Sequence, residues 1–98
     1  MEIMIYKRRR QRSSEPGGHF FLENEENHRK LFGFGEGSRI KLEDTVGTVW
    51  RGSAERGDGD SIYYRFRESE GGVLSGIGHG NQVMLRDFMG RVWKGFVD

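Results

Sequence analysis

The strongest constraint on the fold of this chain is a motif that occurs twice. Residues 39–55 and 82–98 align without a gap, and six of the seventeen positions are identical, where ordinary residue usage gives about one identity. The shared pattern is L-x-D-x-x-G-x-V-W-[RK]-G, and it places both tryptophans of the chain, Trp50 and Trp93, in register. We interpret the two segments as copies of one structural unit.

Each copy of the motif predicts a β-hairpin. An Asp at the first position of a type I turn accepts a hydrogen bond from the backbone two residues on, which suits Asp44 and Asp87. A Gly at the fourth position supplies a positive φ, which suits Gly47 and Gly90. This turn followed by a left-handed Gly is a common bulged hairpin connection. Two such hairpins are expected to close one small barrel.

The returning strand of each hairpin carries Trp-x-Gly, so that the Trp and the Gly lie on the same face of the strand. Gly52 and Gly95 either leave room for an indole of a neighbouring strand or mark a bend where a barrel closes. We expect Trp50 and Trp93 to be core or corner residues. The alternative is that one indole lines a ligand-binding or base-stacking surface.

Other segments alternate apolar and polar residues with period two, which is typical of half-buried antiparallel strands. Gly-rich turn sequences separate these segments, and the chain has 16 Gly and 1 Pro. We therefore predict an all-β, mostly antiparallel fold, a six-stranded barrel or roll that resembles SH3-like and oligonucleotide-binding (OB-like) barrels in architecture alone. The predicted strands lie near residues 39–44, 48–54, 61–67, 73–77, 82–86 and 91–97.

Residues 20–34 fit either of two structures. Glu25 with Arg29 and Glu26 with Lys30 are acid-to-base pairs four residues apart, as on a helix. The same segment has apolar ends around a polar centre, as in a hairpin, and the strand-rich remainder of the chain favours that interpretation. Its aromatic side chains are expected to cover an open edge or end of the barrel: Phe20, Phe21, Phe32 and Phe34.

The composition changes near the N-terminus. Residues 1–12 carry five basic groups and one acidic group, and the basic ones are Lys7, Arg8, Arg9, Arg10 and Arg12. We predict that residues 1–18 form a basic arm, in which residues 2–6 alternate as an edge strand would, and that residues 19–98 form a single β domain. Such an arm binds nucleic acid or an acidic membrane, or it serves as a solubilising tail.

No pattern in the sequence indicates catalysis or a bound metal. The chain has no Cys, and His19, His28 and His79 lack the spacing of a metal site. We therefore expect no enzyme activity, no cofactor and no metal. No apolar run approaches the roughly 20 residues of a membrane span, and residues 1–7 lack the features of a secretory signal, so an intracellular, cytoplasmic location is expected. The oligomeric state is not constrained.

One strand is a candidate binding surface. Tyr63, Arg65 and Arg67 alternate with an apolar row and so face outward together. Exposed aromatic and Arg side chains suit single-stranded nucleic acid, because rings stack on bases and guanidinium groups meet phosphates. Arg51 and Lys94 occupy equivalent positions in the two repeats and would extend this surface. The alternative is an ordinary solvated face with charge pairs to neighbouring Glu residues.

These observations predict a non-catalytic binding module. Protein–protein interaction is the leading function, through an exposed strand edge or an aromatic groove between the hairpins. The alternative is binding of RNA or single-stranded DNA through the face of Tyr63, Arg65 and Arg67 together with the basic arm. The formal net charge of +1 favours neither partner.

Overall fold

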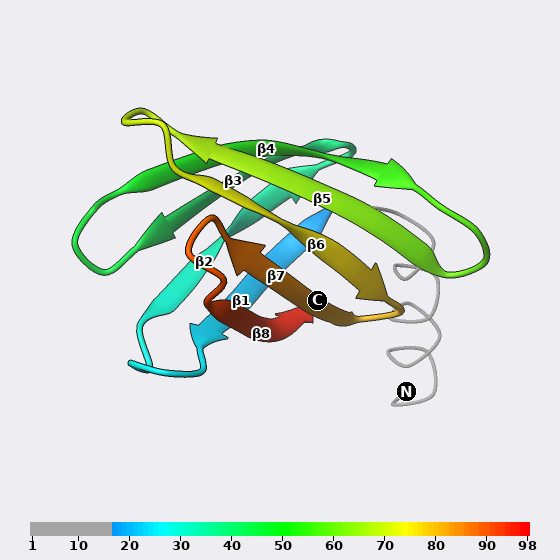
Figure 1. Ribbon diagram of the computed structural model, residues 1–98. Coiled ribbons are helices and arrows are strands. Elements are labelled where there is room, and N and C mark those ends of the chain that lie inside the picture. Colours follow the sequence, from blue (N-terminus) through cyan, green and yellow to red (C-terminus); the bar gives the residue numbers. More distant parts are fainter. Residues whose placement is uncertain (1–16) are drawn as a thin grey trace, which may run out of the picture.

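A computed structural model describes residues 17–98 of this protein. These residues form a closed barrel of eight antiparallel strands that follow one another in chain order, as Figure 1 shows. The strands are β1 (Gly18–Asn24), β2 (Lys30–Glu36), β3 (Arg39–Asp44), β4 (Val49–Arg56), β5 (Ser61–Glu68), β6 (Val73–His79), β7 (Gln82–Asp87) and β8 (Val92–Val97). The prediction of an all-β, antiparallel barrel is confirmed.

The predicted number of strands is wrong. All six expected strands are present, but residues 18–36 add β1 and β2, which pair with each other as a hairpin. β1 also pairs with β8 from Phe20↔Val97 to Asn24↔Trp93, so this hairpin completes the barrel wall. The hairpin interpretation of residues 20–34 is confirmed, and the expected likeness to six-stranded SH3-like or OB-like barrels is not.

The phenylalanines of this hairpin have a different role from the expected one. Phe20 is fully buried in the barrel core, whereas Phe21, Phe32 and Phe34 project outward and are about half exposed. They cover neither an edge nor an end, because β1 and β2 are themselves paired on both sides. The expected edge strand at residues 2–6 and the basic side chains from Lys7 to Arg12 lie outside the described residues.

The repeated unit occurs four times in the barrel. At one end, four turns join β1 to β2, β3 to β4, β5 to β6 and β7 to β8. The first residue of each turn accepts backbone N–H groups with a side-chain oxygen; these residues are Asn24, Asp44, Glu68 and Asp87. In the β7–β8 turn, Asp87 Oδ1 accepts from the N–H groups of Met89 and Arg91, both at 2.9 Å. The two hairpins detected in the sequence are therefore the most similar members of a set of four.

A glycine in the second strand of each hairpin explains how so short a chain closes. A Cβ atom at any of these positions would overlap a carbonyl oxygen of the adjacent strand, and the positions are Gly33, Gly52, Gly76 and Gly95. Each lies opposite an inward-facing side chain of the next hairpin, such as Leu42 opposite Gly33 and Leu22 opposite Gly95. Glycine thus allows the strands to bend and cross closely, as barrel closure requires. The atoms nearest to an added Cβ at Gly52 and Gly95 belong to the backbone of the neighbouring strand and, at Gly52, to the ring of Phe66; none belongs to an indole.

The barrel interior is filled by one apolar cluster. Its members are Phe20, Leu22, Leu31, Ile40, Leu42, Ile62, Tyr64, Phe66, Leu74, Val83, Leu85, Trp93 and Val97. The ring of Tyr64 lies between two of the others, with its centroid 5.6 Å from that of Phe20 and 6.3 Å from that of Phe66. Residues 17–98 contain no helix with the length and apolar character needed to cross a membrane.

The buried phenol of Tyr64 predicts a loss of stability at alkaline pH. Burial raises the pKa of Tyr64 to about 12 from 10.0. Between these values the unfolded chain releases the proton while the folded protein keeps it, so the free energy of unfolding falls as the pH rises. We expect Tyr64 to account for a decrease of about 1 kcal/mol per pH unit in this window. Urea unfolding at several pH values should show a shallower decrease for Tyr64→Phe, and equal slopes for the two proteins would contradict the assignment.

Candidate functional site

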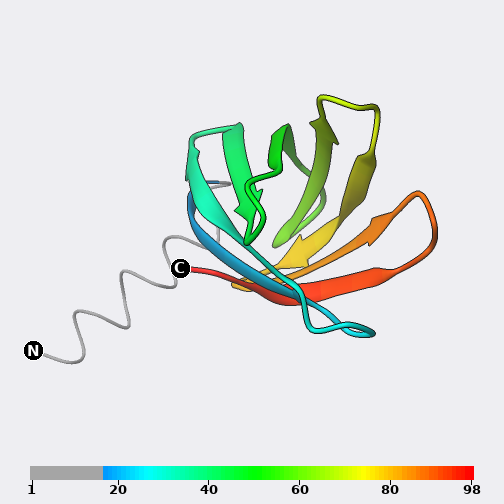
Figure 2. The ribbon, with the colours of Figure 1, turned by 90° about the vertical axis from the view of Figure 1, so that its left-hand side faces the viewer.

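The outer surface of the barrel has two chemically different sides. Because the eight strands follow chain order around a closed ring, the β8–β1 pair lies opposite the β4–β5 pair. Figure 2 shows β4 and β5 (green) on one side of the barrel and β8 (red) on the other. Basic side chains gather on the side of β4 and β5, and aromatic side chains gather on the side of β8 and β1.

A direct row of three cations crosses the basic side. Lys41 of β3 lies opposite Arg51 of β4, and Arg51 lies opposite Arg67 of β5. All three side chains are exposed and point outward. Neighbouring strands are about 4.8 Å apart, so three positive charges occupy adjacent positions on the surface.

A second row runs parallel to the first across five strands. Its cross-strand partners alternate between Arg and Ser in the order Arg39, Ser53, Arg65, Ser75 and Arg86. All five residues are exposed. We call the basic residues of the two rows the cationic face: Arg39, Lys41, Arg51, Arg65, Arg67 and Arg86.

The cationic face is not neutralised within the described part of the chain. Residues 17–98 contain thirteen acidic and eleven basic side chains, yet no ion pair involving those residues reaches any of the six cations. Most carboxylates lie in the turns or at the strand ends beside them, whereas Glu43 and Glu55 are exposed on the same outer wall of β3 and β4 as the cations. The charge pairs that the sequence alternative placed on Arg65 and Arg67 are therefore absent from this part of the protein.

Tyr63 lies at the edge of the cationic face and is 50% exposed. It stands two residues before Arg65 on β5 and opposite Glu55 of β4. The phenol ring rests on the backbone of Gly57, where a Cβ atom would come within 3.0 Å of the ring carbon Cζ. The glycine thus allows the ring to lie against the β4–β5 connection while half of its surface stays open to solvent.

The other sequence-predicted residues lie apart from the cationic face. Lys94 is on β8, at the opposite side of the barrel, and its Nζ binds Glu25 Oε2 at 2.9 Å. Trp93 is buried in the core with Nε1 3.5 Å from Asp87 Oδ2. Trp50 packs against the core, and its buried Nε1 has no hydrogen-bond partner among residues 17–98. Equivalent places in the repeat are thus distributed around the barrel instead of forming one surface.

Four half-exposed phenylalanines form the opposite side, which we call the aromatic face: Phe21, Phe32, Phe34 and Phe96. Phe21 lies opposite Phe32 on one side and opposite Phe96 on the other, and the ring centroids of Phe21 and Phe96 are 5.6 Å apart. Their exposed fractions range from 42% to 52%. The face therefore spans β8, β1 and β2 without interruption.

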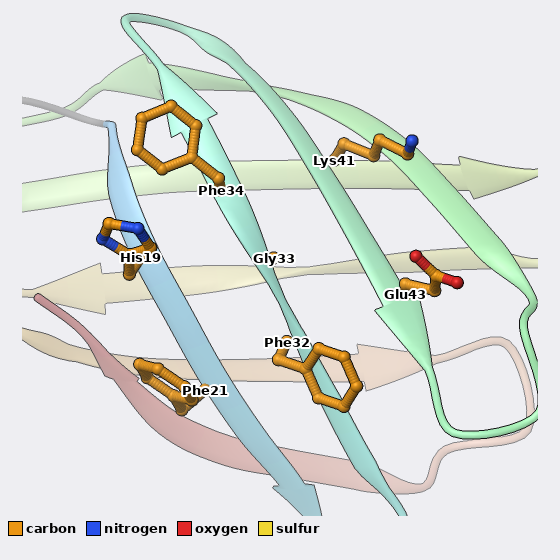
Figure 3. A pocket seen from close by; sticks show the side chains of 7 residues that line it. All are labelled: His19, Phe21, Phe32, Gly33, Phe34, Lys41 and Glu43. Carbon is orange, nitrogen blue, oxygen red and sulfur yellow. The ribbon is translucent and has the colours of Figure 1, made fainter.

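A groove of about 490 Å³ runs along the aromatic face between β1 and β3 (Figure 3). Phe21, Phe32 and Phe34 line the groove, and Gly33 lies between the two phenylalanines of β2 without a side chain to fill it. The rings of His19 and Phe34 pack against each other at an angle of 56°, with centroids 4.9 Å apart. Lys41 and Glu43 of β3 form the polar wall. The volume is in the range of sites that accept small ligands or a few side chains.

Sequence reasoning missed the aromatic face and half of the cationic face. The signal for both was period-two alternation, which places residues such as Phe21, Arg39 and Arg86 on the outer surface once the strands are assigned. The histidines remain scattered: His28 Nδ1 binds Glu23 at 2.8 Å and His79 Nδ1 is 3.3 Å from Ser61 Oγ. No group of three potential metal ligands occurs among residues 17–98.

The structure also excludes one predicted contact. An exposed strand edge is not offered by the described strands, because every one of the eight is paired on both sides. Comparisons of the chain with known protein families, with curated proteins and with solved structures found no match.

Proposed function

We propose that this protein is a non-catalytic binding module whose aromatic face holds an apolar segment of another protein. The observation that supports this function is the continuous set of four half-exposed phenylalanines on β8, β1 and β2. Large exposed apolar patches on soluble domains are typical of interaction sites. Aromatic residues are also enriched at protein interfaces relative to other surfaces.

The outer rings lie on strands that also supply the apolar core of the barrel. Strands β1 and β2 place Phe20 and Leu31 inside, where both are almost fully buried, and the same strands place three phenylalanines outside. The part of each outer ring that stays exposed to water after folding adds nothing to the hydrophobic stabilisation of the barrel. A partner that covers them would recover the free energy of burying that apolar surface.

The partner must bind through side chains. In β-strand addition a peptide pairs with the free edge of a sheet, and strands β1–β8 have no such edge. The groove between β1 and β3 instead accepts apolar side chains against Phe32 and Phe34. Lys41 and Glu43 stand beside them and provide one charge of each sign for the polar groups of the bound segment. We therefore expect a partner segment with one or two large apolar side chains and neighbouring polar groups.

Selection from a library of random linear peptides displayed on phage tests this function. We expect the full chain to enrich peptides rich in Leu, Ile, Phe and Trp. Their affinity should fall at least about thirtyfold for Phe32→Thr/Phe34→Thr, because interface aromatics that anchor a partner contribute about 2 kcal/mol or more each. Binding is measured by isothermal titration calorimetry after circular dichroism has verified the fold of the variant.

Phe88→Thr/Met89→Thr is the matched control. These two side chains lie in the β7–β8 turn, are 75% and 62% exposed and do not line the groove. The control should bind the selected peptides like the wild type. Equal losses in both double variants, or no loss in either, would contradict the proposal. So would self-association of the wild type that disappears in Phe32→Thr/Phe34→Thr, because the face would then serve a second copy of the chain.

A further inference from the structure

We propose that the cationic face binds single-stranded nucleic acid, with phosphates on the two rows of cations and a base stacked on Tyr63. This site lies on β3 to β7, on the opposite side of the barrel from the aromatic face. It does not depend on the protein-binding function proposed above, because Arg51, Arg67 and Tyr63 do not line the groove of the aromatic face. The two faces meet at Lys41 and Phe34, which line grooves on both.

The arrangement of charge on this face points to an anionic ligand. Like charges directly opposite each other on adjacent strands destabilise a sheet, and here Arg51 has a cation opposite it on both sides, Lys41 and Arg67. The described residues contain enough carboxylates to pair with every basic group, yet none is placed within ion-pair distance of these three. Local sequence choices that oppose stability in this way are typical of functional sites.

The types of side chain point to phosphate. Five of the six basic residues of the cationic face are Arg, whose planar guanidinium binds phosphate oxygens with two parallel hydrogen bonds. Ser53 and Ser75 stand between the arginines of the second row and add neutral hydroxyl donors. The ligand is therefore expected to carry several phosphates spaced along a chain.

Two grooves on the cationic face could hold the phosphate backbone of a bound strand. One, of about 580 Å³, is lined by Arg39, Lys41 and Arg51 together with Glu36 and Phe34. The other, of about 570 Å³, lies beside the β3–β4 and β5–β6 turns. Its lining includes Arg51 and Arg67, and also the carboxylates of Glu68 and Glu70. Arg51 borders both grooves, so a chain that follows one groove into the other passes this guanidinium.

Tyr63 distinguishes a nucleic acid from other polyanions. Its ring rests on Gly57 and is half exposed beside Arg65, so it provides a flat surface for a base next to a phosphate-binding group. Stacking of this kind requires an unpaired base. The convex wall of a closed barrel also cannot enter the groove of a duplex, which favours a single strand as the ligand.

The test uses the full chain with short fluorescent oligouridylate and oligodeoxythymidylate probes, titrated between about 50 and 200 mM salt. We expect binding that weakens with salt and falls at least about tenfold in Arg51→Ala/Arg67→Ala. For each phosphate contact removed, the slope of log K against log salt should decrease in magnitude by about 0.7. Tyr63→Ala should weaken binding about tenfold and leave the salt slope unchanged, because a ring that stacks on a base makes no contact with phosphate.

A charge-matched control isolates the face from net charge. Arg91→Ala/Lys94→Ala removes two positive charges that are already paired with Glu26 and Glu25, and it should bind the probes like the wild type. A second control, Arg8→Ala/Arg9→Ala/Arg10→Ala, neutralises part of the basic N-terminal segment. When Tyr63→Ala is added to this triple variant, the affinity for the probes should fall by the same factor as when Tyr63→Ala is made in the wild type.

Three results would overturn the proposal. Equal loss in Arg51→Ala/Arg67→Ala and Arg91→Ala/Lys94→Ala would assign binding to net charge alone. Loss confined to the Arg8, Arg9 and Arg10 variant would place the site in the N-terminal segment. Equal affinity for heparin, duplex DNA or phosphatidylserine vesicles, with no effect of Tyr63→Ala, would make the face a general anion-binding surface. All of these outcomes are independent of the peptide selection, so either proposal can fail alone.

Discussion

Gly95→Ala is expected to lower the free energy of unfolding by about 3 kcal/mol, the upper part of the range for overpacking. The added Cβ would overlap the carbonyl oxygen of Phe21 and lie 2.7 Å from the Cα of Leu22. Both obstacles are backbone atoms of β1 in the ladder that closes the barrel. A neighbouring side chain could move aside by changing its rotamer, but these backbone atoms cannot. Urea unfolding followed by tryptophan fluorescence measures the loss.

Gly90→Ala in the same hairpin is the matched control. Gly90 has a φ of 83° and nothing within 4 Å of the position of an added Cβ, so alanine there causes only the strain of a left-handed backbone, about 1–2 kcal/mol. The same comparison applies to Gly33→Ala and Gly76→Ala, whose obstacles are also backbone atoms. If Gly95→Ala and Gly90→Ala lose the same stability, close strand approach is not what these glycines provide.

Phe66→Ala is expected to lower the free energy of unfolding by about 3–5 kcal/mol, the usual range for a buried Phe. Phe66 is fully buried, stacks on Tyr64 and packs on Gly52, where a Cβ atom would come within 2.8 Å of its Cγ. The neighbouring strands cannot collapse into the cavity because the barrel wall is closed. Equilibrium unfolding in urea should show a lower midpoint with an unchanged m-value.

Phe34→Ala provides the comparison for Phe66→Ala. Phe34 is 52% exposed on the outer surface of β2, and its ring packs against that of His19. Its removal should change the free energy of unfolding by about 1 kcal/mol or less, as for other cross-strand pairs. A large loss in Phe34→Ala would indicate that the outer rings stabilise the barrel itself, and it would weaken the argument that they await a partner.

The duplicated motif predicted the correct local structure, because its Asp and Gly residues specify the turn. The β3–β4 and β7–β8 hairpins form as expected, with Asp44 and Asp87 accepting backbone N–H groups. The other two hairpins were not recognised as copies of the motif, because different residues perform the same tasks. Glu68 replaces the Asp in one of them. In the other, His28 adopts the positive φ of 60° in a turn that is one residue longer.

The error in strand number has a physical cause. In β1 phenylalanine occupies both faces, because Phe20 is buried and Phe21 beside it is exposed. In β2 the phenylalanines face outward and glycines take inward positions, so in both strands the contrast between buried and exposed residues is weak. The surfaces could not be predicted for a different reason. A sequence gives the outward direction of Arg39, Arg51 and Arg67, but only the register of β3, β4 and β5 sets them side by side.

The backbone of His19 meets that of Asp98 through two hydrogen bonds, of 3.0 and 2.7 Å. The two extremes of the described barrel therefore touch, at the end where the short connections Gly37–Ser38 and Gly80–Asn81 join the other hairpins. A linker about as long as these connections would join residue 98 to residue 19. New chain ends could then be placed at either connection, and every strand pairing would be kept. Circular permutation is thus compatible with this fold, and the order in which the four hairpins are synthesised is not dictated by how they pack.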